Sequence, residues 1–133
     1  MPKGLLETEI ESGPKGALMS AFRVSKRGIA IRLENTVHSG DPDIVYTWNR
    51  KTSWWEVKLA DPDFSSNGLQ ELTMLRLSTW GFYAAYIIFE QEPRNVYIVQ
   101  PNCIADWRTR RELVIGGWDF RGVVDYIQGI HKP

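Results

Sequence analysis

Three ionisable residues are spaced so that they could carry out hydrolytic chemistry together. Asp43 opens one apolar run, and thirteen residues later Glu56 lies with Lys58 in a second apolar run. Side chains two residues apart on a strand leave the same face, so Glu56 and Lys58 point together while Val57 points to the other face. If the two runs form a hairpin, Asp43 converges with them. The spacing therefore predicts a cluster of two carboxylates and one ammonium group.

The surroundings of this cluster favour a bound metal ion. Two carboxylates among apolar residues are costly to keep ionised unless a cation compensates their charge. The carboxylates of Asp43 and Glu56 and the backbone carbonyl of Val57 are oxygen ligands of the kind that Mg²⁺ prefers. Lys58 could then orient an attacking water and stabilise charge on a phosphate. The pattern predicts metal-dependent hydrolysis of a phosphate ester.

The first half of the chain contains the elements that must position this cluster. Residues 14–26 have helical composition with Leu18, Met19 and Phe22 on one face, and Gly28 ends the helix. Residues 29–33 alternate with the period of a half-buried strand, and the turn-rich segment 38–42 follows. The β-branched and aromatic runs at 44–48 and 53–59 predict a hairpin.

The second half predicts a helix and further strands. After a loop at 61–68, apolar residues recur at helical spacing and Gly81 supplies a left-handed cap; the apolar residues are Leu69, Leu72, Leu75 or Leu77, and Trp80. Residues 82–89 read as a strand covered on both faces, with 95–100 as its neighbour and 119–130 as a short closing helix. We expect an α/β fold with a mixed sheet flanked by helices.

Composition limits the function classes. The 133 residues carry 16 basic and 16 acidic side chains, which weighs against a DNA coat protein that binds through bulk positive charge. Local cationic stretches lie in residues 1–33 and at 107–111. A single cysteine, Cys103, and the lack of a long apolar run predict a soluble protein of the cytoplasm, or of a host's cytoplasm if a virus encodes it. No membrane partner is expected.

The cluster resembles the motif of the PD-(D/E)XK nuclease superfamily. Pro42-Asp43 corresponds to PD and Glu56-Val57-Lys58 to EXK, and the predicted order of helices and strands fits that fold. Within the superfamily the chain is most similar to the archaeal-type Holliday junction resolvases and to the stand-alone VRR-NUC nucleases of phages. Arg32-Leu33-Glu34-Asn35 and Gln70 support the second comparison. The resemblance covers residues 7–100 of a single nuclease domain, with 101–133 as a C-terminal extension.

The resemblance implies the roles of further residues. Asp43, Glu56, Lys58 and Gln70 would be catalytic, with Mg²⁺ as the cofactor and Mn²⁺ as a substitute. The family usually has a metal-binding glutamate on its first helix, and here Glu7, Glu9 and Glu11 all precede Pro14. We choose Glu11 by its distance from Gly28, with Glu34 as an alternative. The expected DNA contacts are Arg32, Glu34, His38, Ser39, Lys26 and Arg27.

The resemblance also implies a substrate and an assembly. We expect an endodeoxyribonuclease that resolves four-way junctions as a homodimer, because two symmetric incisions need two active sites. Trp54 or Trp55 and the apolar face of the closing segment could supply the contact between protomers. The alternatives are a nuclease or nickase that acts on flaps, single strands or duplex DNA, and a DNA-binding protein of the same fold without the chemistry.

Overall fold

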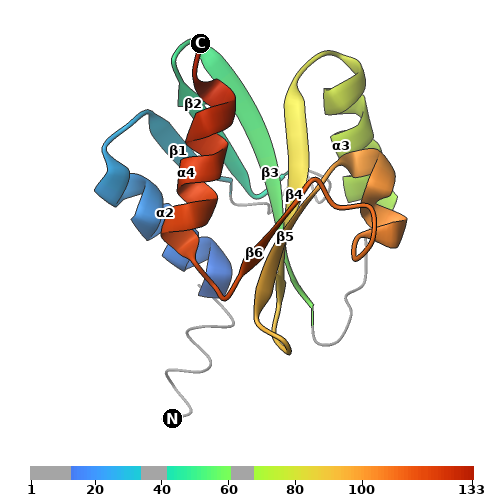
Figure 1. Cartoon of the computed structure of the whole chain (residues 1–133). Coiled ribbons are helices and arrows are strands. Elements are labelled where there is room, and N and C mark those ends of the chain that lie inside the picture. Colours follow the sequence, from blue (N-terminus) through green and yellow to red (C-terminus); the bar gives the residue numbers. More distant parts are fainter. Residues whose placement is uncertain (1–12, 34–41, 61–67) are drawn as a thin grey trace.

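A computed structural model describes residues 13–33, 42–60 and 68–133. These residues form an α/β fold with one six-stranded mixed sheet flanked by helices, as predicted (Figure 1). No helix among them is long and apolar enough to cross a membrane. In chain order the elements are α2 (Gly13–Ser25), β1 (Ile29–Arg32), β2 (Ile44–Trp48), β3 (Lys51–Ala60), α3 (Gly68–Thr79), β4 (Tyr83–Glu90), β5 (Asn95–Val99), η1 (Pro101–Asp106), β6 (Leu113–Gly116) and α4 (Phe120–His131).

The sheet follows the chain from one edge to the other in the order β1-β2-β3-β4-β5-β6. β1, β2 and β3 form an antiparallel meander, in which Ile44 pairs with Trp55. β3 and β4 are parallel, with Glu56 opposite Tyr86, and α3 connects them. β5 and β6 then add in antiparallel orientation. β3 and β4 therefore lie at the centre of the sheet, and Glu56 and Lys58 lie on β3 just beyond its last pair with β2.

Helices cover both faces of the sheet (Figure 1). α2 and α4 pack on one face, and their apolar side chains join those of the sheet in one core cluster. α3 and η1 pack on the other face around Met74, Tyr86 and Trp107. Trp55 and Val57 belong to the first cluster, whereas Trp54 packs against the second. The alternation predicted for this strand is therefore confirmed, and Glu56 and Lys58 face the α3 layer.

Local sequence explains where the N-terminal helix ends. The predicted face of α2, Leu18, Met19 and Phe22, is buried against the core. At Gly28 the backbone φ is +70°, and a Cβ there would lie 2.5 Å from the carbonyl oxygen of Thr47. Only glycine fits this close approach of the chain to β2. The turn after α2 is thereby fixed, and β1 enters the sheet in register with β2.

The C-terminal region contributes more than the predicted closing helix. β6 extends the sheet at the edge formed by β5, and η1 lies beside α3; neither element was predicted. α4 buries Val123, Val124 and Ile127 against the rest of the chain. The apolar face that we expected at a protomer contact is thus occupied within the protomer. Of the two alternatives for the other expected contact, Trp55 is fully buried, whereas Trp54 is half-buried.

The apolar residues whose spacing predicted α3 are, except for Leu77, not the ones that the helix buries. The helix forms as predicted, and Gly81 adopts a left-handed conformation with φ of +91°. However, Leu69, Leu72, Leu75 and Trp80 are all exposed, and the helix packs through Met74 with Leu77. Helical periodicity predicted the element but not its orientation, because contacts with β4 and η1 determine which side is buried.

Candidate active site

Glu56 and Lys58 meet on the face of β3 that is directed toward α3. The Lys58 Nζ lies 3.4 Å from Glu56 Oε2 and donates a hydrogen bond of 2.7 Å to Gln70 Oε1. Gln70 lies in the first turn of α3, so helix and strand together fix the ammonium group. The structure therefore brings together three of the four residues for which the sequence predicts catalytic roles.

Asp43, which immediately precedes β2, completes the group. Its Oδ2 accepts a hydrogen bond of 2.8 Å from the backbone N–H of Val57, and its Oδ1 forms an ion pair of 2.8 Å with Lys15 Nζ. Lys15 belongs to α2, which covers the face opposite to α3. Asp43 therefore lies at the side of β3, between the two helical layers. The bond to Val57 holds it next to the strand that carries Glu56 and Lys58.

Glu56 is buried to a degree that is unusual for a carboxylate. Its exposed fraction is 2%, and its Oε1 has no hydrogen-bond partner among the residues that the structure describes. The pKa of Glu56 is raised to about 7: burial raises it most and the charge of Asp43 adds to this, whereas Lys58 and Lys15 lower it. A buried carboxylate with a free oxygen is costly unless a proton or a cation neutralises it. A proton or a bound cation would therefore stabilise Glu56 in this position.

Tyr86 lies on β4, directly beside Glu56 of β3. The two residues are direct partners in the β3–β4 ladder, and the buried Tyr86 hydroxyl has no hydrogen-bond partner in the described part of the chain. Burial raises the pKa of Tyr86, and the negative charges of Glu71 and Glu56 raise it further. The hydroxyl therefore remains protonated and available as a donor. Two unsatisfied polar groups, an acceptor and a donor, thus adjoin the same site.

The oxygen donors fit a magnesium ion. Mg²⁺ is commonly held by one or two carboxylates and completes its six ligands with water and substrate phosphate. Asp43 and Glu56 supply the carboxylates, and the unpartnered Oε1 of Glu56 is the donor left for a ligand. The Val57 carbonyl points to the same side as its N–H, toward Asp43 and beyond the last pair of the β2–β3 ladder. In the part of the chain that the structure describes, no cluster of three His, Cys, Asp or Glu side chains exists.

The arrangement is suited to the hydrolysis of a phosphate ester. When bound, Mg²⁺ would acidify a water molecule and offset charge on the phosphate. Lys58, held by Gln70 and Glu56, would direct its ammonium group toward that phosphate or toward the attacking water. Asp43 and Glu56 would fix the position of the cation relative to Lys58. These roles follow from the positions of the side chains and remain predictions.

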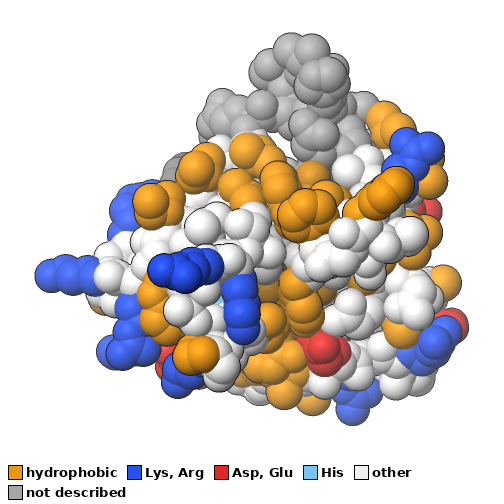
Figure 2. Space-filling model, turned by 90° about the horizontal axis from the view of Figure 1, so that it is seen from above, with side chains coloured by type: hydrophobic (Ala, Val, Ile, Leu, Met, Phe, Trp, Pro, Cys, Tyr) orange, Lys and Arg blue, Asp and Glu red, His pale blue; other side chains and the backbone are white. Residues whose placement is uncertain are grey.

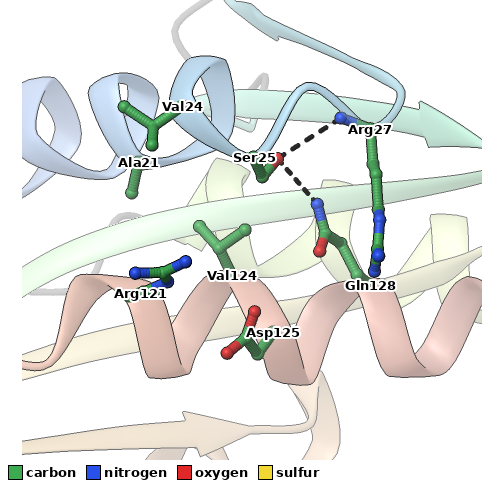
Figure 3. Close-up of a pocket in the computed structure, with 8 residues that line it drawn as sticks. All are labelled: Ala21, Val24, Ser25, Arg27, Arg121, Val124, Asp125 and Gln128. Atoms are coloured by element: carbon green, nitrogen blue, oxygen red, sulfur yellow. Dashed lines mark hydrogen bonds between the residues drawn. The ribbon is translucent and has the colours of Figure 1, made fainter.

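The expected DNA contacts lie at different places. Arg32 ends β1 and pairs with Ile44, next to Asp43. Lys26 and Arg27 lie at the other end of this ladder, roughly 15 Å away at the rise of a strand. Arg27 lines a cavity of about 330 Å³ between α2 and α4, together with Arg121 and Asp125 (Figure 3). The structure therefore brings Arg32 near the site, but not Lys26 and Arg27.

Several predicted residues lie outside the described part of the chain. They include the candidate metal ligand Glu11 with its alternatives Glu7, Glu9 and Glu34, and the candidate DNA contacts His38 and Ser39. The described site thus consists of Asp43, Glu56, Lys58 and Gln70.

The sequence interpretation missed two neighbours of the site. Lys15 pairs with Asp43, although a lysine near a helix start reads as a solvated side chain. Tyr86 was taken only as part of an apolar strand. Its position follows from the parallel register of β3 and β4, which no local pattern encodes. A central strand carrying a tyrosine opposite a glutamate is a signal that could have identified it.

A second constellation, Ser53 with His131, has the residue types of a nucleophile and a base. Ser53 Oγ and His131 Nε2 are 2.7 Å apart, and Trp55 Nε1 donates to the same oxygen. Both residues are buried, with 1% of His131 exposed, so substrate cannot reach them. The pair ties α4 to β3 and is structural.

Comparison with known proteins adds no family assignment. No family model matches the chain, and no curated protein matches it. The resemblance to the nuclease superfamily therefore depends on the residues and geometry described above.

Proposed function

We propose that this chain is a magnesium-dependent endodeoxyribonuclease with a PD-(D/E)XK core. Asp43 and Glu56 would hold the metal, Lys58 would act on the attacking water or the phosphate, and Gln70 would position Lys58. The spacing of Asp43, Glu56 and Lys58 matches the superfamily motif. The arrangement of a helix, a three-stranded meander, a crossover helix and a parallel strand is compatible with that core.

The observation that carries the proposal is the environment of Glu56. This carboxylate is buried with one oxygen unpartnered, 3.4 Å from a lysine that a glutamine holds. A purely structural ion pair would use both oxygens, because an unsatisfied buried acceptor costs about 1–3 kcal/mol. The same argument counts against the alternative of a DNA-binding protein without chemistry, which would have no use for this cost.

We propose branched DNA as the substrate class, with a four-way junction cut by a homodimer as the first candidate. A two-fold dimer supplies two equivalent sites for two symmetric incisions. Flaps, single strands and ordinary duplex remain alternative substrates for a nuclease or nickase with the same site. The local chemistry is identical in all these cases, because each presents the same phosphodiester to the metal and Lys58.

A cleavage assay on defined substrates tests the proposal. The purified protein is incubated with a labelled four-way junction, a flap, a single strand and a linear duplex, each with Mg²⁺ or with EDTA. We expect cleavage with Mg²⁺ only, strongest on a branched substrate. Cleavage that persists in EDTA would contradict the metal site, and intact substrates in every Mg²⁺ reaction would leave the DNA-binding alternative.

A further inference from the structure

A groove on the α3 side of the sheet has the composition of a nucleobase-binding surface. It has a volume of about 310 Å³ and is lined by Thr73, Arg76, Leu77, Trp80 and Phe82. Trp80 is 80% exposed and Phe82 is 47% exposed, so both rings are open to a ligand. Large exposed aromatic side chains that adjoin one another mark binding sites more often than ordinary surface.

The groove leads toward the candidate active site. Gln70, Thr73, Leu77 and Trp80 follow one another at spacings of three or four residues, so they share one side of α3. Gln70, at one end of this row, accepts the hydrogen bond from Lys58. Trp80, at the other end, lies roughly 15 Å away along the helix axis. That distance corresponds to about four nucleotides at the 3.4 Å spacing of stacked DNA.

Phe82, which lies just before β4, links the groove to β3. Trp54 contacts Phe82 edge to face, with the ring centroids 6.5 Å apart. Trp54 and Glu56 are two residues apart on β3, so they share the face directed toward α3. Figure 2 looks onto the end of the molecule where α3 ends and β4 begins. Hydrophobic side chains gather across the middle of this face, and most Lys and Arg side chains lie around its margin.

The charge and the aromatic side chains of the groove favour one class of ligand over others. Among the residues that the structure describes, Arg76 is the only charged residue that lines the groove. Aromatic rings beside a cation are the elements with which proteins hold single-stranded nucleic acid, because bases stack on the rings while the cation contacts a phosphate. The bases of intact duplex are already stacked on one another and cannot enter. A nucleotide strand with unpaired bases therefore fits the groove better than duplex does.

We propose that the groove binds an unpaired segment of the DNA substrate, a few nucleotides long, and directs it toward Glu56 and Lys58. Trp80 and Phe82 stack the bases, and Arg76 contacts the backbone. This inference rests on the proposed function, because it takes DNA as the ligand. It narrows the substrate to DNA with an unpaired segment beside the cleaved bond, such as a flap, a free strand or an opened branch point.

Binding measured in EDTA tests the inference without requiring cleavage. Fluorescence anisotropy is recorded for a labelled twelve-nucleotide single strand and for a blunt duplex of the same sequence. We expect the wild-type protein to prefer the single strand. We expect Trp80→Ala to weaken its binding roughly tenfold, on the scale of one stacked base, and Trp80→Phe to restore most of the loss. Arg76→Ala should reduce the salt dependence of binding.

Leu75→Ala is the matched control, because Leu75 is an exposed residue of α3 that does not line the groove. It should bind like the wild type. Single-strand binding that Trp80→Ala leaves unchanged, or equal affinity for blunt duplex, would overturn the inference. So would a change in sedimentation caused by Trp80→Ala, which would show that a second copy of the chain covers the groove.

The two proposals fail in different ways. If the protein cleaves DNA with Mg²⁺ but Trp80→Ala leaves single-strand binding unchanged, the proposed role of the groove is refuted and the nuclease proposal stands. If Trp80→Ala weakens single-strand binding but the wild-type protein cleaves no substrate, the nuclease proposal is refuted and the proposed role of the groove stands.

Discussion

Glu56 is the residue at which the fold and the proposed chemistry make opposite demands. Burial opposes its charge and raises its pKa to about 7, yet a metal site needs the carboxylate in its charged form. Lys58 and Lys15 lower that pKa and so offset part of the cost. The proposed metal site therefore predicts that this carboxyl group would exchange its proton for a metal ion near neutral pH.

This pKa predicts how stability depends on pH. The folded pKa lies above the ordinary value of 4.5, so the contribution of Glu56 to stability is fully present below pH 4.5 and is lost as pH rises through 7. Without divalent metal, the wild-type free energy of unfolding should fall by about 3 kcal/mol more than that of Glu56→Gln between pH 4.5 and 8. Urea unfolding at several pH values measures the difference.

Added Mg²⁺ should reverse part of this loss at pH 8, where the carboxylate is charged, and should have little effect at pH 5. The Glu56→Gln variant provides the control, because it cannot titrate at this position. Equal pH dependence of the two proteins would contradict the assigned environment of Glu56.

Lys58 should act on the chemical step. Lys58→Ala removes the ammonium group held by Gln70 and Glu56, and single-turnover cleavage should slow by roughly 10²-fold or more. Lys51→Ala is the matched control, because Lys51 is an exposed lysine that begins the same strand and bonds the carbonyl of Lys132. A Lys58→Ala defect that appears only as weaker DNA binding would make Lys58 a phosphate contact.

At the scale of elements, β3 joins the two halves of the molecule. Its face toward α3 carries Glu56 and Lys58, while Ser53 on the same strand holds α4 through His131. His131 Nδ1 also bonds the carbonyl of Trp48, and Asn49 bonds the carbonyl of His131. The C-terminal helix is thereby fixed to the hairpin that positions the site.

Loss of the Ser53 hydroxyl should destabilise this junction. Ser53→Ala leaves the buried Trp55 Nε1 and His131 Nε2 without their shared partner, at an expected cost of about 1–3 kcal/mol. Thr52→Ala removes a hydroxyl whose bond to Thr47 is exposed, so its effect should be small. Chemical denaturation compares the two variants, and equal stability of Ser53→Ala and wild type would show that the network contributes little.

Local patterns in the sequence account for much of the fold. Alternation at 44–48 and 53–59 located the hairpin, and Gly28 and Gly81 located the helix ends. The sequence did not reveal β6, because its four residues follow an arginine-rich turn and alternate between half-buried and exposed positions. It also did not show that α3 packs through Met74 and Leu77. Both failures concern contacts between distant segments, which periodicity does not encode.

The sequence also predicted part of the candidate site, namely the residues that local spacing on one strand brings together. The spacing of Glu56 and Lys58 on one strand brought them together, since a strand alternates its side chains regularly. The ion pair of Lys15 with Asp43 and the position of Tyr86 depend on helix packing and on the parallel register of β3 and β4. Such relations arise only when the whole sheet is assembled.

At the scale of the whole molecule, the α3 layer leaves apolar side chains exposed, whereas the apolar face of α4 is buried within the chain. Val123, Val124 and Ile127 are buried within the chain, so α4 offers no free apolar face for a second copy. On the edge strand β1, Ile29 and Ile31 remain exposed. A homodimer would therefore have to use another part of the surface than the closing helix.

The junction-resolving form of the proposal predicts such a dimer in the absence of DNA. Sedimentation equilibrium at micromolar concentration should give twice the mass of one 15.3 kDa chain. Each bound four-way junction should then receive two nearly simultaneous nicks. A monomer that accumulates singly nicked junctions would exclude the resolvase and favour a nickase.

Single-turnover cleavage by the wild type, Glu56→Gln and Asp43→Asn tests the central claim most directly. Each substitution removes charge that would hold the metal while keeping the shape of the side chain. With Mg²⁺, the wild-type protein should cut its branched or single-stranded substrate, and both variants should bind the same DNA without cutting it. Cleavage by either variant at the wild-type rate, or no cleavage by the wild type, would contradict the account.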